Sequence, residues 1–115
     1  MTHLGFHYIW DIYNCNYKAI DKVPEVQTLM AELLQISNLT KLSESFNQFA
    51  PHGVTGIYLL EESHLSVHTW PENNYVAIDL FSCVSLDNLA TVEQALRKHF
   101  GTVRIDFKIL ERGKV

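Results

Sequence analysis

The 115-residue sequence has little cysteine, few basic residues and no long apolar run, and each shortage argues against a class of protein. Its two cysteines, Cys15 and Cys83, are too few for the disulfide framework of a small secreted domain, so both are expected to be free thiols. A formal net charge of −4 argues against nucleic acid or anionic membrane as a partner. No hydrophobic stretch reaches membrane-spanning length, and the N-terminus lacks a signal-peptide pattern. The sequence therefore predicts a cytoplasmic protein.

The composition is that of a single globular domain spanning residues 1–115. Hydrophobic residues make up 47% of the chain and charged residues 19%. A chain of this length buries a real core but has little depth for a cleft. We therefore expect an active site that is shallow or shared between subunits.

Hydrophobic periodicity predicts the element order β-α-β-β-β-β-α-β. Within the second predicted strand, Phe46 and Phe49 have opposite parity, so one of them needs a role outside the core. Tight turns between successive strands favour antiparallel pairing. We expect an α+β two-layer sandwich, a mainly antiparallel sheet with two helices on one face. The predicted strands are 4–12, 42–49, 54–62, 64–70, 75–83 and 103–109, and the predicted helices are 24–37 and 86–100.

The stretch EESHLSVHTWPE, residues 61–72, carries hydroxyls and imidazoles that a purely structural strand does not need. His64 and His68 are four residues apart, like zinc ligands on a helix, but in a strand this spacing is roughly 13 Å. No metal site is therefore expected. A serine hydrolase built on Ser63 or Ser66 lacks the usual Gly-x-Ser-x-Gly elbow. A polar sheet face at a subunit contact is the plain structural alternative.

The longer stretch EESHLSVHTWPENNYVAIDLFSC resembles the signature of the small prokaryotic S-adenosylmethionine decarboxylases, pyruvoyl enzymes of the spermidine pathway. The segments LGFHYIWDIYNC and FNQFAPHGVTG extend the resemblance over most of the chain. The resemblance implies a self-cleaving proenzyme that is cut between Glu62 and Ser63 into residues 1–62 and 63–115. The Ser63 hydroxyl would attack the Glu62 carbonyl, and β-elimination would leave a covalently bound pyruvoyl group at residue 63.

The same resemblance assigns roles to further residues. His68 matches the base that acts in processing, and the Thr55 hydroxyl stands where the family has an assisting serine. The pyruvoyl ketone would form a Schiff base with the α-amine of a small amino-acid substrate and accept the electrons released with carbon dioxide. Cys83 matches the proton donor, and His64 is expected to be structural. The family's active unit is a homodimer of processed protomers, with sites near the interface.

The resemblance also outlines a substrate site. Phe49 matches the aromatic residue that stacks on adenine, and Glu72 matches the acid that binds the ribose hydroxyls. Trp70 would line the pocket or pack beside it. Phe6 and Val84 depart from the family pattern near the pocket, so arginine or ornithine is an alternative substrate. A non-enzymatic dimerising module that has kept the motif is the alternative of another class.

Overall fold

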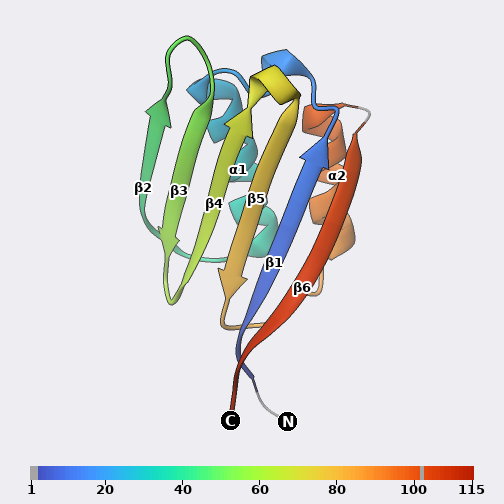
Figure 1. Cartoon of the computed structure of the whole chain (residues 1–115). Coiled ribbons are helices and arrows are strands. Elements are labelled where there is room, and N and C mark those ends of the chain that lie inside the picture. The colour runs from blue at the N-terminus through green and yellow to red at the C-terminus, as the bar shows by residue number, and fades with distance from the viewer. Residues whose placement is uncertain (1–2, 102) are drawn as a thin grey trace.

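Six strands pair into one sheet, and two helices lie across one of its faces (Figure 1). This computed structural model describes residues 3–101 and 103–115. The predicted element order and the two-layer α+β sandwich are confirmed. The strands are β1 (His3–Tyr13), β2 (Lys41–Gln48), β3 (Val54–Leu60), β4 (Ser63–Trp70), β5 (Tyr75–Ser82) and β6 (Arg104–Lys114); the helices are α1 (Val23–Ser37) and α2 (Leu89–Phe100), with single 3₁₀ turns η1 (Tyr17–Ala19) and η2 (Pro71–Asn73).

The strand order is β2-β3-β4-β5-β1-β6, and every neighbouring pair is antiparallel. Strand β1 therefore lies between β5 and β6, which come from the other half of the chain. Its pairing with β6 continues to His3 opposite Lys114, so the beginning of β1 and the end of β6 lie side by side (Figure 1). The sheet interleaves the N-terminal and C-terminal halves of the sequence.

Alternation along each strand creates the core on the helix-covered face. Tyr8 and Ile12 of β1 and Leu65 of β4 are buried there against the apolar stripes of the helices. Helix α1 begins with Pro24 in its first turn, where the missing N–H costs nothing. Cys15 is also buried in this core, and burial raises the pKa of its thiol to about 12, as suits a packing residue.

The two phenylalanines of opposite parity separate as the sequence analysis requires. Phe46 packs towards the core, edge-on to the Tyr58 ring at 5.8 Å, and its own ring lies directly over Gly56. A side chain at Gly56 would collide with that ring, which explains a glycine inside a strand. Phe49 follows the end of β2 and is 49% exposed. It is therefore the phenylalanine that is free for another role.

Some element boundaries differ from prediction. Strand β3 ends at Leu60 because residues 61–62 form a turn, and α2 begins at Leu89 instead of residue 86. Strand β6 continues to Lys114, beyond the predicted residue 109, because its backbone pairing with β1 outlasts its apolar alternation. Pairing partners, which periodicity does not report, decide where these elements end.

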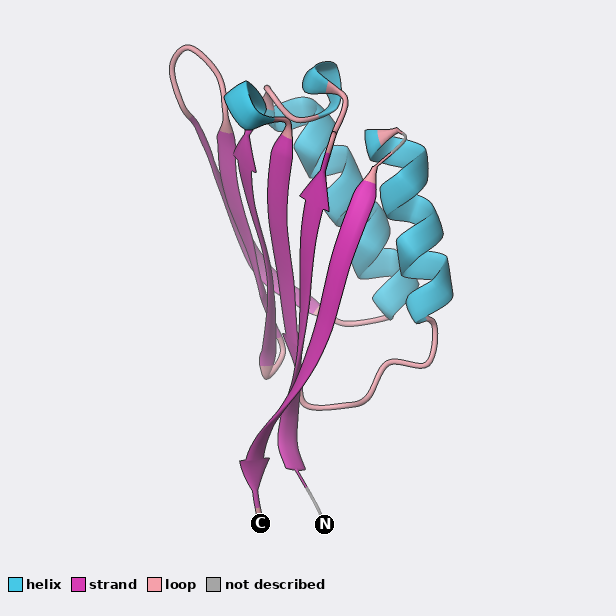
Figure 2. Cartoon of the chain, turned by 45° about the vertical axis from the view of Figure 1, so that its right-hand side comes forward, coloured by secondary structure: helices cyan, strands magenta, loops and turns pink. Residues whose placement is uncertain are grey.

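The sheet face opposite the helices is called the open face here, because no described helix covers it (Figure 2). It carries polar side chains from the central strands, including His7, His64 and His68. It also carries the exposed apolar side chains of Ile57 and Leu59, which are 44% and 52% accessible. Exposed apolar residues next to polar ones are typical of an interaction surface. Among the described residues, no helix is long and apolar enough to cross a membrane.

Candidate active site

Ser63 is the first residue of β4 and follows directly on a tight turn. Leu60 pairs with Ser63 across the hairpin, so Glu61 and Glu62 alone make the connection. Glu62 has a φ of 59°, in the left-handed region, which costs a non-glycine residue about 1–2 kcal/mol. The peptide bond between Glu62 and Ser63 thus begins at a strained and exposed residue.

Cys83 lies beside this bond because β4 and β5 are antiparallel neighbours. The register pairs His64 with Phe81, which brings the residue after β5 next to the residue before β4. The Cys83 thiol donates a hydrogen bond to the Glu62 carbonyl oxygen at 2.9 Å. This carbonyl is the group that the Ser63 hydroxyl would attack. Glu62, Ser63 and Cys83 are called the cleavage-end group below.

His68 and Thr55 form a second pair, further along the sheet. They are directly opposite each other on β4 and β3, and the Thr55 hydroxyl lies 3.1 Å from His68 Nδ1. If the hydroxyl donates to Nδ1, the proton of the neutral imidazole is on Nε2. If Nδ1 carries the proton and donates to the hydroxyl, Nε2 is free to act as a base. The direction of the hydrogen bond between Thr55 and His68 therefore corresponds to which nitrogen of His68 can take up a proton.

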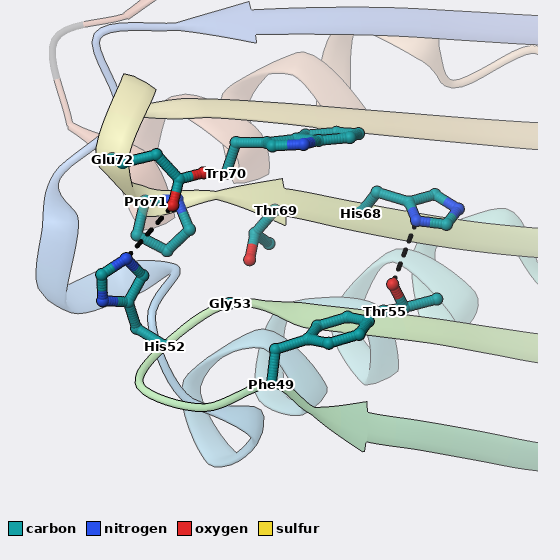
Figure 3. Close-up of a pocket in the computed structure, with 9 residues that line it drawn as sticks. All are labelled: Phe49, His52, Gly53, Thr55, His68, Thr69, Trp70, Pro71 and Glu72. Atoms are coloured by element: carbon teal, nitrogen blue, oxygen red, sulfur yellow. Dashed lines mark hydrogen bonds and ion pairs between the residues drawn. The ribbon is translucent and has the colours of Figure 1, made fainter.

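A hollow of about 310 Å³ opens next to this pair, where β4 ends (Figure 3). Figure 3 shows Phe49 and Trp70 on opposite sides of it, His68 towards one end and Glu72 towards the other. The Trp70 ring stacks on Tyr75 at 5.2 Å, which fixes its plane. Aromatic side walls with a few polar groups are typical of a small-molecule site. The hollow is lined by Phe49, His52, Gly53, Thr55, His68, Thr69, Trp70, Pro71 and Glu72.

One chain does not bring the predicted site residues together. Ser63 and His68 are five residues apart on the same strand, which corresponds to roughly 16 Å. Ser63 lies with Cys83 at one end of the sheet. His68 lies with Thr55, Phe49, Trp70 and Glu72 at the other, and these five are called the pocket group. The candidate residues therefore form two separate groups in a single protomer.

A third cluster, which the sequence analysis missed, occupies the open face around Asp79. His7 Nε2 lies 2.6 Å and His64 Nε2 3.3 Å from one carboxylate oxygen, and the Ser66 hydroxyl donates to the other. Burial alone would raise the pKa of Asp79, but these hydrogen bonds bring it below its ordinary value. No sequence pattern links these residues, because their meeting depends on strand order and register.

The three ligand-type atoms of His7, His64 and Asp79 lie within 4.8 Å of one another, as metal ligands do. The surroundings favour hydrogen bonding instead. Arg112 Nη1 lies 3.2 Å from His7 Nδ1, and a guanidinium can only donate. Nδ1 is therefore the acceptor, and Nε2 of the neutral ring carries the proton that it donates to Asp79. The cluster is a hydrogen-bonded carboxylate on the open face.

Sequence reasoning also missed two residues at the hollow. Thr69 is buried, and its hydroxyl accepts from Val54 N at 2.9 Å and donates to the Ile20 carbonyl at 2.8 Å, so it fixes the floor of the hollow. His52 lines the hollow from the loop between β2 and β3. Its segment, APHG, is predicted only as a turn, and the histidine within it is the signal that was available.

Comparison with known proteins places the chain in a family. The family model described as S-adenosylmethionine decarboxylase matches residues 6–113. An S-adenosylmethionine decarboxylase proenzyme from Sulfurihydrogenibium sp. is 45% identical over 112 residues, covering 97% of this chain and 84% of the relative. One from Methanococcus aeolicus is 33% identical over 115 residues, covering 100% and 98%. The crystal structure of the adenosylmethionine decarboxylase from Aquifex aeolicus superposes with a TM-score of 0.89 at 34% identity, covering 100% of this chain and 95% of that one.

Proposed function

The chain belongs to the S-adenosylmethionine decarboxylase family, and on that premise we propose that it is a self-processing decarboxylase of S-adenosylmethionine that supplies the aminopropyl donor for spermidine biosynthesis. The observation that carries the proposal is the hydrogen bond from the Cys83 thiol to the Glu62 carbonyl. It joins a potential proton donor to the bond that a self-cleaving enzyme of this family would break. The relatives named above are all decarboxylases of this substrate, so arginine and ornithine are not favoured, nor is a non-enzymatic module.

Self-cleavage follows from the chemistry of the cleavage-end group. The Ser63 oxygen forms a bond to the Glu62 carbonyl carbon while the peptide C–N bond breaks and the hydroxyl proton passes to the Ser63 nitrogen, which converts the amide into an ester and a free amine. The thiol of Cys83 stabilises negative charge on the carbonyl oxygen during this step. A base then removes the Ser63 α-proton and the Cβ–O bond of Ser63 breaks. The upstream chain leaves with a backbone carboxylate at Glu62. Water displaces the nitrogen as ammonia and leaves the pyruvoyl group at residue 63.

The residues present fit such a group, because Ser63 begins a strand and its preceding bond is in an exposed turn. The pyruvoyl group supplies an electron sink for the decarboxylation of an α-amino acid. Cys83, freed from Glu62 after cleavage, is then positioned to give a proton to the carbon that has lost carbon dioxide. Phe49 provides a flat apolar surface for adenine, and Glu72 provides acceptors for the two ribose hydroxyls.

We further propose that the working site is completed by a second copy of the chain. The base His68 is roughly 16 Å along the strand from its own Ser63, whereas proton transfer needs atoms about 3 Å apart. A two-fold axis that runs across the strands would pack two open faces together and reverse the strand direction of one sheet relative to the other. The pocket group of one protomer would then face the cleavage-end group of its partner. Exposed Ile57 and Leu59 support burial of this face.

Intact mass and carbon dioxide release test the proposal. The purified protein should appear as residues 1–62 and 63–115, the second blocked at its N-terminus by the pyruvoyl group. The Ser63→Ala variant should stay whole, and cleavage of that variant at the same bond would refute the mechanism. The processed protein should release carbon dioxide from S-adenosylmethionine. Release only from arginine or ornithine would refute the substrate.

A further inference from the structure

We propose that His52, itself held by Tyr17, is a positioning residue that orients the Glu72 carboxylate towards the ribose diol of the substrate. The inference rests on the proposed function, since it assigns a residue to the substrate site suggested there. It gives a role to His52, which lies in the segment FNQFAPHGVTG but had none among the roles that the resemblance implies. It also makes the recognition of the sugar depend on a hydrogen-bonded chain of three side chains instead of on Glu72 alone.

The three side chains come from three separate elements that meet at the end of the sheet. His52 Nε2 lies 3.1 Å from Glu72 Oε2 on η2, as the dashed line in Figure 3 marks. His52 Nδ1 lies 2.9 Å from the hydroxyl of Tyr17 on η1. The Tyr17 ring meets the imidazole edge-on at 5.6 Å, so packing as well as hydrogen bonding holds the imidazole.

The direction of these hydrogen bonds follows from what each group can do. An ionised carboxylate only accepts, so His52 Nε2 must carry a proton and donate it to Glu72. In the neutral imidazole Nδ1 is then an acceptor, and the Tyr17 hydroxyl donates to it. The chain therefore runs from Tyr17 through His52 to one oxygen of Glu72. The other oxygen, Oε1, is left available for the hydroxyls of a ligand.

Glu72 needs such a support because nothing else described restrains its carboxylate. Its side chain is 53% exposed, and a glutamate has three rotatable bonds to fix when a ligand binds. Among the described residues, His52 is the one side chain that contacts this carboxylate by a hydrogen bond or ion pair. A carboxylate that is already oriented loses less freedom on binding, so the held form binds a diol more tightly than a free one.

The loop that carries His52 is anchored without the imidazole. Lys22 Nζ donates to the Pro51 carbonyl at 2.8 Å, and Gly53 N donates to the Asp21 carbonyl at 3.1 Å. Both bonds join the backbone next to His52 to the segment before α1. Replacing the imidazole should therefore release Glu72 and leave the loop in place, which makes His52 suitable for a substitution test.

The test compares His52→Ala, His52→Gln and Tyr17→Phe with wild type and with Lys18→Ala, a control beside Tyr17. For His52→Ala we expect about a tenfold rise in KM for S-adenosylmethionine, the effect of one hydrogen bond to a charged group. Its kcat, its self-cleavage and its thermal melting should stay close to those of wild type. His52→Gln keeps an N–H donor and should recover most of the loss. Tyr17→Phe keeps the ring and should give a smaller rise.

A double-mutant cycle shows whether His52 acts through Glu72. In a Glu72→Gln background, the added His52→Ala change should alter the KM for the substrate by less than twofold. The His52→Ala change should also have little effect on the KM for a 2′-deoxy analogue of the substrate. If the wild type is active and His52→Ala has an unchanged KM, the role of His52 is refuted and the proposed function stands. An equal rise in KM when His52→Ala is added to Glu72→Gln would also refute the role of His52. A correctly cleaved wild type that releases no carbon dioxide from S-adenosylmethionine would overturn the proposed function, and the inference with it.

Discussion

Two inactive variants, produced together in one cell, should restore cleavage to each other in a predictable way. The Ser63→Ala chain keeps His68 but has no nucleophile, and the His68→Ala chain keeps Ser63 but has no base. On β4 the two positions are five residues apart, roughly 16 Å, far beyond the reach of a proton transfer. If a partner supplies His68, each chain alone should be defective, and a mixed dimer should contain one complete site.

The size of the effect follows from the symmetry of the dimer. With equal expression and random pairing, about half of all chains are in mixed dimers, and each mixed dimer has Ser63 and His68 facing each other only once. About half of the His68→Ala chains should therefore be cut into residues 1–62 and 63–115. The Ser63→Ala chains should all stay whole. Different affinity tags on the two chains and intact mass spectrometry would count both populations.

Two results would refute this reasoning. The first is a His68→Ala chain that stays uncut in verified mixed dimers, because it would mean that His68 acts within its own chain. The second is a monomeric wild-type protein that cleaves itself at the normal rate. As a matched control, mixing Ser63→Ala with the double variant Ser63→Ala, His68→Ala should give no cleavage in either chain.

Three further outcomes are expected. Cys83→Ala should be cleaved at least in part but should release carbon dioxide slowly; near-normal turnover would remove Cys83 from the role of proton donor. Phe49→Ala should raise the KM for S-adenosylmethionine by roughly two- to tenfold, since stacking adds about 0.5–1.5 kcal/mol, with self-cleavage unchanged. Burial lowers the pKa of His99, so the folded protein binds fewer protons there and stability should fall as the pH drops below the ordinary value of 6.5. Thermal melts between about pH 5 and 8 should show this loss, and His99→Gln should weaken it.

The order of elements and the layer arrangement could be predicted because they depend on local patterns. Alternation in residues 64–70 and 75–83, joined by a short turn, predicts that these strands are antiparallel neighbours. The observed register of β4 and β5 confirms this pairing and brings Cys83 beside Glu62. The same local logic separates Phe46 from Phe49. Where a feature depends on the spacing of residues in one segment, the sequence is sufficient.

The features that could not be predicted depend on contacts between distant segments. The position of β1 between β5 and β6 has no periodic signature, so the cluster of His7, His64 and Asp79 was invisible in the sequence. Tyr17 and His52 are 35 residues apart and lie in a turn and a loop, where apolar spacing carries no information. The distance between Ser63 and His68 could be derived from strand geometry. That the cleavage-end group and the pocket group lie at opposite ends of the sheet follows only from the structure.

Because the strand order interleaves the two halves of the chain, the sheet does not depend on where the chain begins and ends. Cleavage between residues 62 and 63 would leave β1, β2 and β3 in one fragment and β4, β5 and β6 in the other. Three strand borders, β3–β4, β5–β1 and β1–β6, would then join the two fragments. Since His3 at the start of β1 lies opposite Lys114 at the end of β6, a circular permutant that links the original ends and begins at Ser63 should build the same sheet. Its residue 63 would carry a free amine, because no Glu62 carbonyl precedes it. Such a permutant should melt like the cleaved protein and release no carbon dioxide.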